Sequence, residues 1–215
     1  MNTVNIERLN AVTRAQKETT GQGEAAGQKG AYHHGDLRSA LLAAALAILL
    51  ESGVEGLSLR GVARRAGVSP SAPYKRFASK GALLAELADD RRGQAGRAFR
   101  AAMAAAETPL AKLEALGVAY VAYALEHRAE FKLIFGGALR PPAAREVRDT
   151  PLLGLFRSAV GDAHTTLSGA ELEAAAIAAW SLAHGLAQLV IDGPLGGLEE
   201  DAEGLARLAG RVTRA

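Results

Sequence analysis

The sequence predicts an all-α fold. Of its 215 residues, 49% are hydrophobic but only 5% are aromatic, and Ala and Leu, which favour helices, recur along the chain. The sequence has no alternating runs of Val, Ile and Thr of the kind that indicate strands. Clusters of Gly, Pro and Ser divide it into segments of helical length. We therefore expect an N-terminal three-helix domain followed by a C-terminal helical domain.

Charge is distributed unevenly along the chain, although the formal net charge is only +2. Residues 29–100 hold twelve Lys and Arg against six Asp and Glu, whereas residues 101–215 hold ten against fourteen. This division indicates that the basic segment meets a polyanion and that the acidic segment does not. The absence of cysteine excludes disulfides, thiol nucleophiles and thiolate metal sites.

The helices of the basic segment can be placed from their caps. Residues 1–31 are polar and are predicted to form a disordered arm. Helical periodicity begins at Asp36 and ends at the Glu-Ser-Gly run that starts at residue 51. Ser58 is expected to cap a short helix that ends at Gly67. Its predicted buried stripe is Leu59, Val62, Ala63 and Ala66.

Two further caps continue the pattern. Ser69 is expected to cap the next short helix, with Pro70 at its first helical position. Ser79 is expected to cap a longer helix that reaches about Ala106. Beyond it, we predict a flexible loop at 136–147. The remaining helices are predicted at 109–127, 128–136, 148–167, 169–191 and 198–212.

The spacing from Leu59 to Phe77 predicts a helix-turn-helix. A helix of about eight residues, a turn of about three and a second short helix form that motif. The turn needs a residue that accepts a positive φ, and Gly67 supplies it. Phe77 and two valines, Val62 and Val68, are placed to hold the helix pair on a core.

The second helix of the pair is expected to present its polar side chains to double-stranded DNA. Lys75 and Arg76 can contact phosphates, or Arg76 can form two hydrogen bonds to guanine. Side chains near helix N-termini extend this anion-binding surface. The alternative is a solvated basic face on an ordinary helical hairpin. The residues predicted to bind DNA are Ser58, Ser69, Ser71, Tyr74, Lys75, Arg76 and Lys80.

The segment LSLRGVARRAGVSPSAPYKRFASKGALLAEL resembles the DNA-binding domain of the TetR family of bacterial transcriptional repressors. The family pattern joins an AGVS turn to a Tyr-x-His-Phe-x-x-Lys motif, and the resemblance covers residues 36–88. Arg76 stands where the family usually has histidine. Pro73 occupies a position that the family usually fills with another apolar residue facing the core.

Two other segments resemble one TetR subgroup. AAWSLAHGLAQLVIDG, residues 178–193, is similar to the Trp-His-Gly signature of that subgroup's ligand-binding domain, and residues 31–60 resemble its opening. The resemblance implies a homodimer in which each subunit carries a sensing domain. The predicted organisation is an arm at 1–31, a DNA-binding domain at 32–79 and an effector-binding and dimerisation domain at 80–215.

The aromatic residues of the second half are the candidate effector site. Trp180 and His184 share a helix face. They either line an apolar cavity, with His184 as its polar contact, or form a packed core pair. The other aromatic side chains could likewise line a pocket or form ordinary core. These are Tyr120, Tyr123, His127, Phe131, Phe135 and Phe156.

The sequence carries no signature of catalysis. His33, His34 and Asp36 lack a metal-ligand spacing, because neighbouring histidines point apart. The apolar stretch from Ala40 to Leu50 is half the length needed to span a bilayer. We expect no catalytic residues, no metal, no cofactor and no membrane contact.

Together these features predict a cytoplasmic, bacterial regulator. The resemblance implies that helices 169–191 and 198–212 pair across a two-fold axis, so that two recognition helices meet a palindromic operator. The simplest form is a repressor released by a small apolar or amphipathic effector, and an activator is an alternative. The alternative from another class is a helical small-molecule- or partner-binding protein without specific DNA binding.

Overall fold

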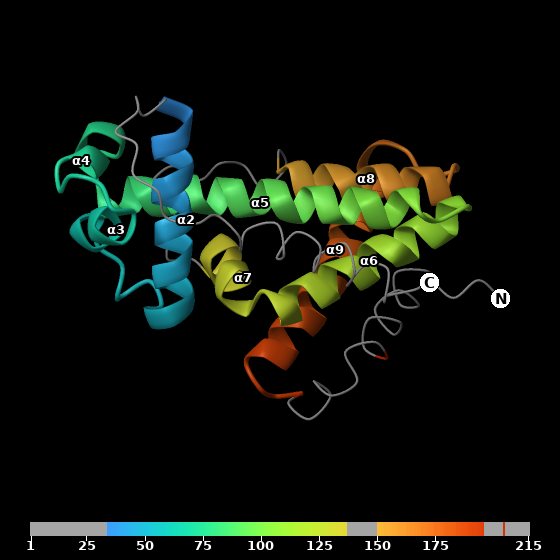
Figure 1. Ribbon diagram of the computed structural model, residues 1–215. Coiled ribbons are helices and arrows are strands. Elements are labelled where there is room, and N and C mark those ends of the chain that lie inside the picture. The colour runs from blue at the N-terminus through green and yellow to red at the C-terminus, as the bar shows by residue number, and fades with distance from the viewer. Residues whose placement is uncertain (1–33, 137–149, 196–203, 205–215) are drawn as a thin grey trace. The chain divides into compact units, whose positions relative to one another are not determined.

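The computed structural model describes residues 34–136, 150–195 and 204, and these residues form eight α-helices and no strand (Figure 1). The predicted all-α fold is confirmed. The helices are α2 (His34–Ser52), α3 (Leu59–Arg65), α4 (Ala72–Arg76), α5 (Lys80–Ala104), α6 (Pro109–Glu126), α7 (Arg128–Phe135), α8 (Pro151–Ala163) and α9 (Gly169–Ile191).

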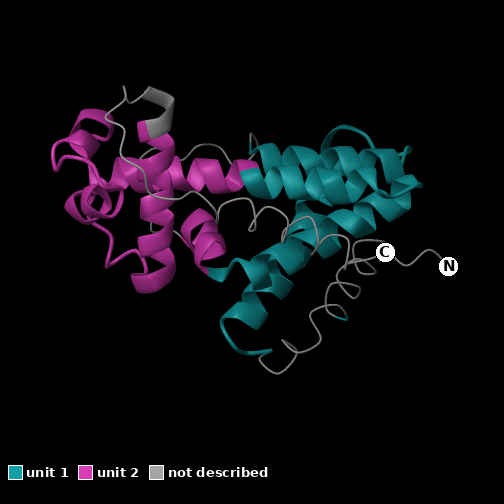
Figure 2. Ribbon diagram, viewed as in Figure 1, with its two compact units in different colours: residues 1–23, 94–128, 141–215 teal, residues 24–93, 129–140 magenta. Residues whose placement is uncertain are grey.

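The chain divides into two compact units (Figure 2). Unit 1 comprises residues 1–23, 94–128 and 141–215, and unit 2 comprises residues 24–93 and 129–140. Unit 2 therefore holds α2, α3, α4, the first part of α5 and nearly all of α7. Unit 1 holds the rest of α5 together with α6, α8 and α9.

The core of unit 2 is built from leucines that recur at helical spacing. Leu41, Leu83 and Leu87 are fully buried, and Val62 of α3 is buried among them. Leu133 of α7 joins the same core, although the chain leaves this unit at residue 93 and returns only at residue 129. The hydrophobic face of α7 thus belongs to the unit that contains the helix-turn-helix.

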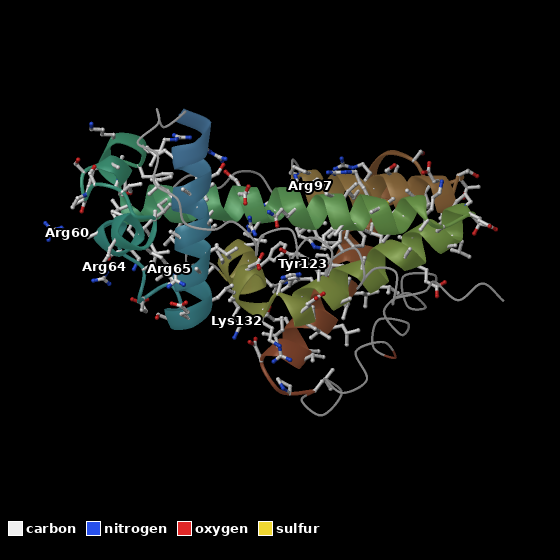
Figure 3. All side chains as sticks on the ribbon, in the orientation of Figure 1. Arg60, Arg64, Arg65, Arg97, Tyr123 and Lys132 are labelled. Atoms are coloured by element: carbon white, nitrogen blue, oxygen red, sulfur yellow. The ribbon has the colours of Figure 1, made fainter. Side chains whose placement is uncertain are left out.

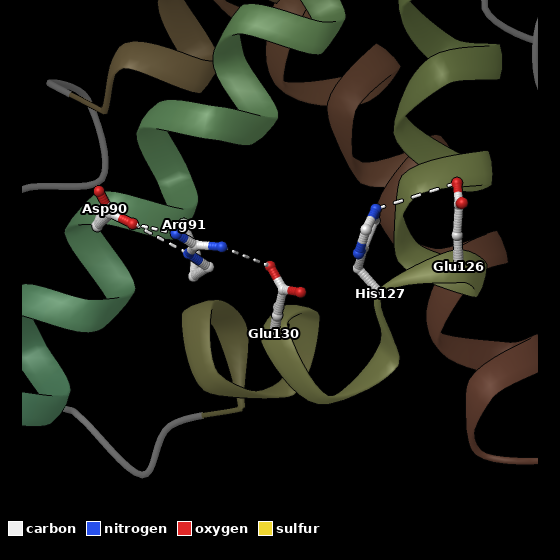
Figure 4. Close-up of polar contacts among 5 residues, drawn as sticks. All are labelled: Asp90, Arg91, Glu126, His127 and Glu130. Carbon is white, nitrogen blue, oxygen red and sulfur yellow. Dashed lines mark hydrogen bonds and ion pairs between the residues drawn. The ribbon is translucent and has the colours of Figure 1, made fainter. Parts of the chain in front are cut away.

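A buried ion pair also attaches α7 to α5 within unit 2 (Figure 4). The Glu130 residue is only 6% exposed, and its Oε2 lies 3.9 Å from Nη1 of Arg91. Arg91 also donates to the carboxylate of Asp90. Burying a carboxylate is costly unless a cation compensates it, so Arg91 stabilises the position of α7.

In unit 1, α6, α8 and α9 pack against one another, and α9 does so mainly through alanine. Its buried stripe includes Ala176, Ala179, Ala183 and Ala187. Small side chains at this spacing allow neighbouring helices to approach closely, while larger side chains of α6 and α8 fill the space between them. Tyr120 and Phe156 are the largest of these buried side chains.

Most predicted helices agree with the structure to within two residues, and 169–191 agrees at both ends. The helix predicted at 148–167 is too long. The Thr150 hydroxyl accepts a hydrogen bond from the Leu153 amide, which starts α8 at Pro151, and His164 leaves the helical conformation. The predicted arm at 1–31, nearly all of the loop at 136–147 and nearly all of the helix at 198–212 lie outside the described residues.

We expect Arg91→Ala to lower the free energy of unfolding by more than about 1 kcal/mol, because it removes the cation beside a buried carboxylate. Arg92→Ala is the matched control, since Arg92 pairs with the exposed side chain of Asp89. That variant should change stability by less than about 0.5 kcal/mol. Urea unfolding of both variants makes the measurement, and equal losses would contradict the role assigned to Arg91.

Candidate functional site

The turn between α3 and α4 follows the predicted geometry. Gly67 has φ +67°, and it follows the last turn of α3. The Val68 amide donates to the Ala63 carbonyl at 3.0 Å, and the Gly67 amide donates to the Arg64 carbonyl at 3.3 Å. These two bonds form a Schellman motif, which ends a helix and reverses the chain when the residue at this point accepts a positive φ. The predicted role of Gly67 is confirmed.

The start of α4 differs from the prediction. Ser69 does not cap a helix that begins at Pro70, because α4 begins at Ala72 after Ser71. The Ala72 amide donates to the Ser69 carbonyl at 2.9 Å, which closes a four-residue turn with Pro70 at its second position. Proline is favoured there because its fixed φ suits the turn. Pro73 lies in the first turn of α4, where the missing amide hydrogen of proline costs little.

The helix-turn-helix leaves most of the predicted DNA-binding side chains exposed. Tyr74 is 54% exposed, and Lys75 is exposed beside it. Ser69 and Ser71 are also exposed, with their hydroxyl oxygens 3.3 Å apart. Phe77, by contrast, is 2% exposed and anchors the end of α4 in the core of unit 2.

Two further predicted residues, Ser58 and Lys80, lie at helix N-termini. The Ser58 hydroxyl oxygen accepts a hydrogen bond from the Gly61 amide at 3.1 Å, so Ser58 caps α3 as predicted. Lys80 opens α5 and is partly buried. The Ser79 hydroxyl accepts from the Ala82 amide at 3.1 Å beside it, which confirms the predicted cap.

Ion pairs determine which cations of this unit keep their charge uncompensated. Both terminal nitrogens of Arg65 donate hydrogen bonds to the Glu51 carboxylate, each at 2.6 Å. Arg76 donates one to the Glu86 carboxylate at 2.8 Å. Within the part of the chain that the structure describes, Lys75 has no ion-pair partner.

Arg60 and Arg64 were missed by the sequence analysis. Both are exposed on α3 and project into solvent (Figure 3), and the described residues hold no ion-pair partner for either. Their spacing of four residues, opposite the buried stripe of Leu59, Val62 and Ala63, was the available signal.

In unit 1, three of the predicted effector residues form a hydrogen-bonded network. Trp180 Nε1 donates to the Tyr120 hydroxyl at 3.3 Å, and that hydroxyl lies 2.8 Å from Nδ1 of His184. Trp180 can only donate, so the Tyr120 hydroxyl accepts from Trp180, and it donates to His184 Nδ1 in the tautomer that leaves this nitrogen unprotonated. This arrangement requires a neutral His184 with its proton on Nε2.

The environment of the network favours the neutral forms of both titratable groups. Tyr120 is 1% exposed, and burial raises the pKa of its hydroxyl despite the opposing effect of the hydrogen bond from Trp180. Burial also lowers the pKa of His184 below its usual 6.5. The network is therefore an uncharged polar contact between α6 and α9, in which Tyr120 is buried and Trp180 and His184 are partly buried.

Aromatic rings surround the Tyr120 side chain. Phe156 packs edge-on at 6.1 Å between ring centroids. Phe99 of α5, which the sequence analysis missed, lies 5.6 Å from Tyr120 and 5.7 Å from Tyr123. Its position in the predicted long helix was the available signal. Tyr123 in turn lies 4.5 Å from His127.

The other predicted aromatic residues are placed differently. His127 ends α6, and its Nε2 lies 4.0 Å from the carboxylate of Glu126 (Figure 4). Phe131 and Phe135 belong to unit 2, where their ring centroids are 4.8 Å apart. The structure therefore assigns Tyr120, Tyr123, His127, Phe156, Trp180 and His184 to unit 1 and the two α7 phenylalanines to unit 2.

The fold and the exposed α3–α4 pair define a helix-turn-helix regulatory protein with a second, helical unit. Residues 41–87 match the bacterial regulatory proteins of the tetR family, and residues 113–212 match the tetracyclin repressor-like C-terminal domain. The chain therefore belongs to the TetR family. No curated protein matches the sequence.

Solved structures share this fold. A protein of unknown function from Rhodococcus sp. RHA1 is 34% identical, with 87% of this chain and 100% of that chain covered and a TM-score of 0.71. A TetR/AcrR-family regulator from Thermobifida fusca YX-ER1 is 21% identical, with 84% and 100% covered and a TM-score of 0.61. The regulator FadR from Bacillus subtilis, in complex with stearoyl-CoA, is 14% identical, with 80% and 96% covered and a TM-score of 0.59.

The lowered pKa of His184 makes stability depend on pH. As the pH falls below about 6.5, the unfolded chain takes up the proton before the folded chain does, so the folded state loses stability. We expect the free energy of unfolding to fall more steeply between pH 7.5 and 5.5 in the wild type than in His184→Gln. Urea unfolding over this range tests the difference. His164→Gln, which changes a histidine outside the network, is the control, and identical profiles for the wild type and His184→Gln would contradict the assignment.

Proposed function

We propose that this TetR-family chain is a dimeric repressor that binds a palindromic operator in the cytoplasm and leaves it when an effector binds. The observation that carries the proposal is the charge pattern around the helix-turn-helix. Tyr74 and Lys75 are exposed on the second helix, and Arg60 and Arg64 extend the same charge on the first. Cations without acidic partners attract phosphates, while side chains at base edges supply sequence preference.

The DNA contacts divide by chemistry. Ser69, Ser71 and Tyr74 carry hydroxyls that suit phosphate oxygens, and Lys75 supplies a point charge. The hydroxyl of Ser58 keeps a hydrogen to donate while its oxygen caps α3. Lys80 and Arg76 complete the proposed set of DNA-binding residues.

We propose that α9 forms the centre of the dimer interface. Its outer surface exposes Ile177, Leu182 and Leu189, at 41%, 47% and 46%. A side chain added at Gly185 would meet nothing within 4 Å, so this position allows close approach of a second helix. Such a surface suits a two-fold interface, in which the same patch meets itself.

By length and composition, α9 could also cross a membrane, and 33% of its most apolar window is buried in the protein. We propose a protein interface instead, because the opposite face of α9 already packs on α6 and α8 through its alanines. A membrane-spanning helix would have lipid around it, whereas α9 exposes only the face that does not pack on α6 and α8.

We propose that the effector is a small apolar or amphipathic molecule held by the aromatic residues of unit 1. Tyr123 and His127 continue the aromatic group from the buried Tyr120 network toward the end of α6. The FadR structure, which contains stearoyl-CoA, shows that a chain of this fold can hold such a ligand. A compound that raises the melting temperature and releases operator DNA would identify the effector, and a Tyr123→Ala variant with unchanged response would exclude this position.

We also propose membership of the Trp-His-Gly subgroup. Support comes from the shared contact of Trp180 and His184 with one hydroxyl, which gives both signature residues a common role. Gly185, the third signature residue, falls on the proposed dimer surface. The signature would then join the sensing core to the dimer interface along one helix.

The DNA-binding proposal predicts a large effect of changing α4. We expect Tyr74→Ala with Lys75→Ala to lower affinity for DNA from upstream of the gene by at least about tenfold, because both side chains contact the backbone. Lys75→Ala alone should reduce the slope of log affinity against log salt by about one unit. Fluorescence anisotropy with operator and random DNA makes the measurement.

Arg97→Ala is the charge-matched control for Lys75→Ala, because Arg97 is an exposed cation of unit 1 (Figure 3). It should leave both quantities unchanged. Wild-type protein that binds upstream and random DNA equally at physiological salt would instead favour a helical partner- or ligand-binding protein.

The dimer proposal predicts that Leu182→Glu yields a monomer, because it places a charge in the centre of an apolar interface. Leu50→Glu is the control, since Leu50 is also an exposed leucine, at 58%, but lies on α2 in unit 2. Sedimentation velocity distinguishes the two states. A Leu182→Glu protein that sediments as the wild type does would place the interface elsewhere.

A further inference from the structure

Two arginines of unit 2 share a single carboxylate oxygen. Arg76, at the end of α4, donates through Nη2 to Oε1 of Glu86 at 2.8 Å. Arg38, on α2, donates through Nε to the same oxygen. Glu86 lies on α5, so one acidic side chain connects three helices of the unit that carries the helix-turn-helix.

The carboxylate is the least exposed member of this cluster. The Glu86 side chain is 23% exposed, whereas those of Arg38 and Arg76 are 39% and 46% exposed. Both arginine side chains are therefore more exposed to solvent than the Glu86 side chain. The cluster keeps a net charge of about +1, because two cations share one anion.

Each guanidinium uses only part of its donor capacity. A guanidinium has five N–H donors in a planar fork, and a single oxygen accepts from one nitrogen of each arginine here. Arg76 keeps Nε, Nη1 and the second hydrogen of Nη2, and Arg38 keeps both terminal nitrogens, so each arginine retains an edge with two N–H groups. The remaining donors match two phosphate oxygens in the paired geometry that arginine favours.

Arg65 shows the contrasting arrangement within the same unit. Both of its terminal nitrogens donate to the two oxygens of Glu51, so its fork is occupied by a carboxylate. The Glu51 side chain is 56% exposed, more than the 41% of Arg65. Glu51 thus neutralises an arginine that is less exposed than itself, whereas Glu86 is less exposed than the two arginines that it binds.

The position of Arg76 is also fixed from the backbone side. The next residue, Phe77, is buried in the core, and its ring centroid lies 5.5 Å from the Arg76 guanidinium carbon. The Arg76 side chain is therefore held by the buried residue that follows it, by contact with the Phe77 ring and by one hydrogen bond to Glu86. Ordering a flexible arginine before binding reduces the entropy lost when a ligand is contacted.

We propose that Glu86 is a positioning residue that orders Arg76 and Arg38 into a paired site for DNA phosphate. The inference rests on the proposed function, since it needs the α3–α4 pair to dock on DNA. It assigns Arg76 to the backbone and not to a guanine edge. Sequence preference then falls to the other exposed side chains of α4.

The direction in which operator affinity changes when Glu86 is removed distinguishes a positioning role from simple charge neutralisation. Glu86 carries a negative charge near DNA, so its removal should tighten binding if charge alone matters. If Glu86 positions the arginines, its removal weakens operator binding despite the gain in net positive charge. Glu51→Gln is the matched control, because it removes an acid from another arginine pair of this unit.

The experiment measures operator and random DNA binding by full-length dimer over a range of salt concentrations. We expect Glu86→Ala to weaken operator binding by about fivefold to tenfold and to lower the salt slope by about one unit, as one ordered phosphate contact is lost. Glu86→Gln should lose less, because its amide oxygen still accepts from arginine. Glu51→Gln should bind at least as tightly as the wild type.

The salt slope distinguishes positioning from a folding defect, because a smaller active fraction shifts the apparent affinity without changing the slope. Equal or tighter operator binding by Glu86→Ala overturns the proposal. So does a loss that persists in full when Arg38 and Arg76 are both alanine. Wild-type protein that does not prefer operator to random DNA contradicts the proposed function itself, and this inference with it. A clear wild-type preference without a Glu86 effect contradicts only the inference.

Discussion

The left-handed backbone at Gly67 is the constraint on which the DNA-binding surface depends. A positive φ ends α3 by a Schellman motif and turns the chain toward α4. The core then holds the pair from both sides, through Val62 of α3 and Phe77 after α4. With these two anchors fixed, the residues between them that do not reach the core must face solvent. Tyr74 and Lys75 are exposed for this reason.

The distribution of positive charge on unit 2 depends on which of its cations form ion pairs with acidic side chains. Glu51 and Glu86 take up Arg65, Arg38 and Arg76, and these pairs leave Lys75 and the outer face of α3 uncompensated. Lys75, Arg60 and Arg64 therefore keep their positive charge on the exposed surface of the helix-turn-helix. The same pairing orders Arg76, so one set of contacts both distributes charge and positions a side chain.

Unit 1 holds an uncharged polar network beside its apolar core, in which Tyr120 is buried and Trp180 and His184 are partly buried. The Tyr120 hydroxyl satisfies the Trp180 and His184 nitrogens together, and burial keeps the group neutral. Alanines on α9 allow the helices to approach closely enough for these contacts. The aromatic residues predicted as an effector site are thus partly core, and Tyr123 and His127 extend from it.

The sequence by itself determined the fold class, the caps and the turn. These features depend on local chemistry, in which Ser58, Gly67 and Ser79 act on their nearest neighbours in the chain. The start of α4 was misplaced because the Ser69 carbonyl closes a turn around Pro70 that competes with a helix there. Only the tertiary structure decided the long-range pairings, since nothing in the local pattern links Arg38 or Arg76 to Glu86, or Tyr120 to His184. It also decided that α7 joins unit 2, because its buried Leu133 and Glu130 find partners that lie far away in the sequence.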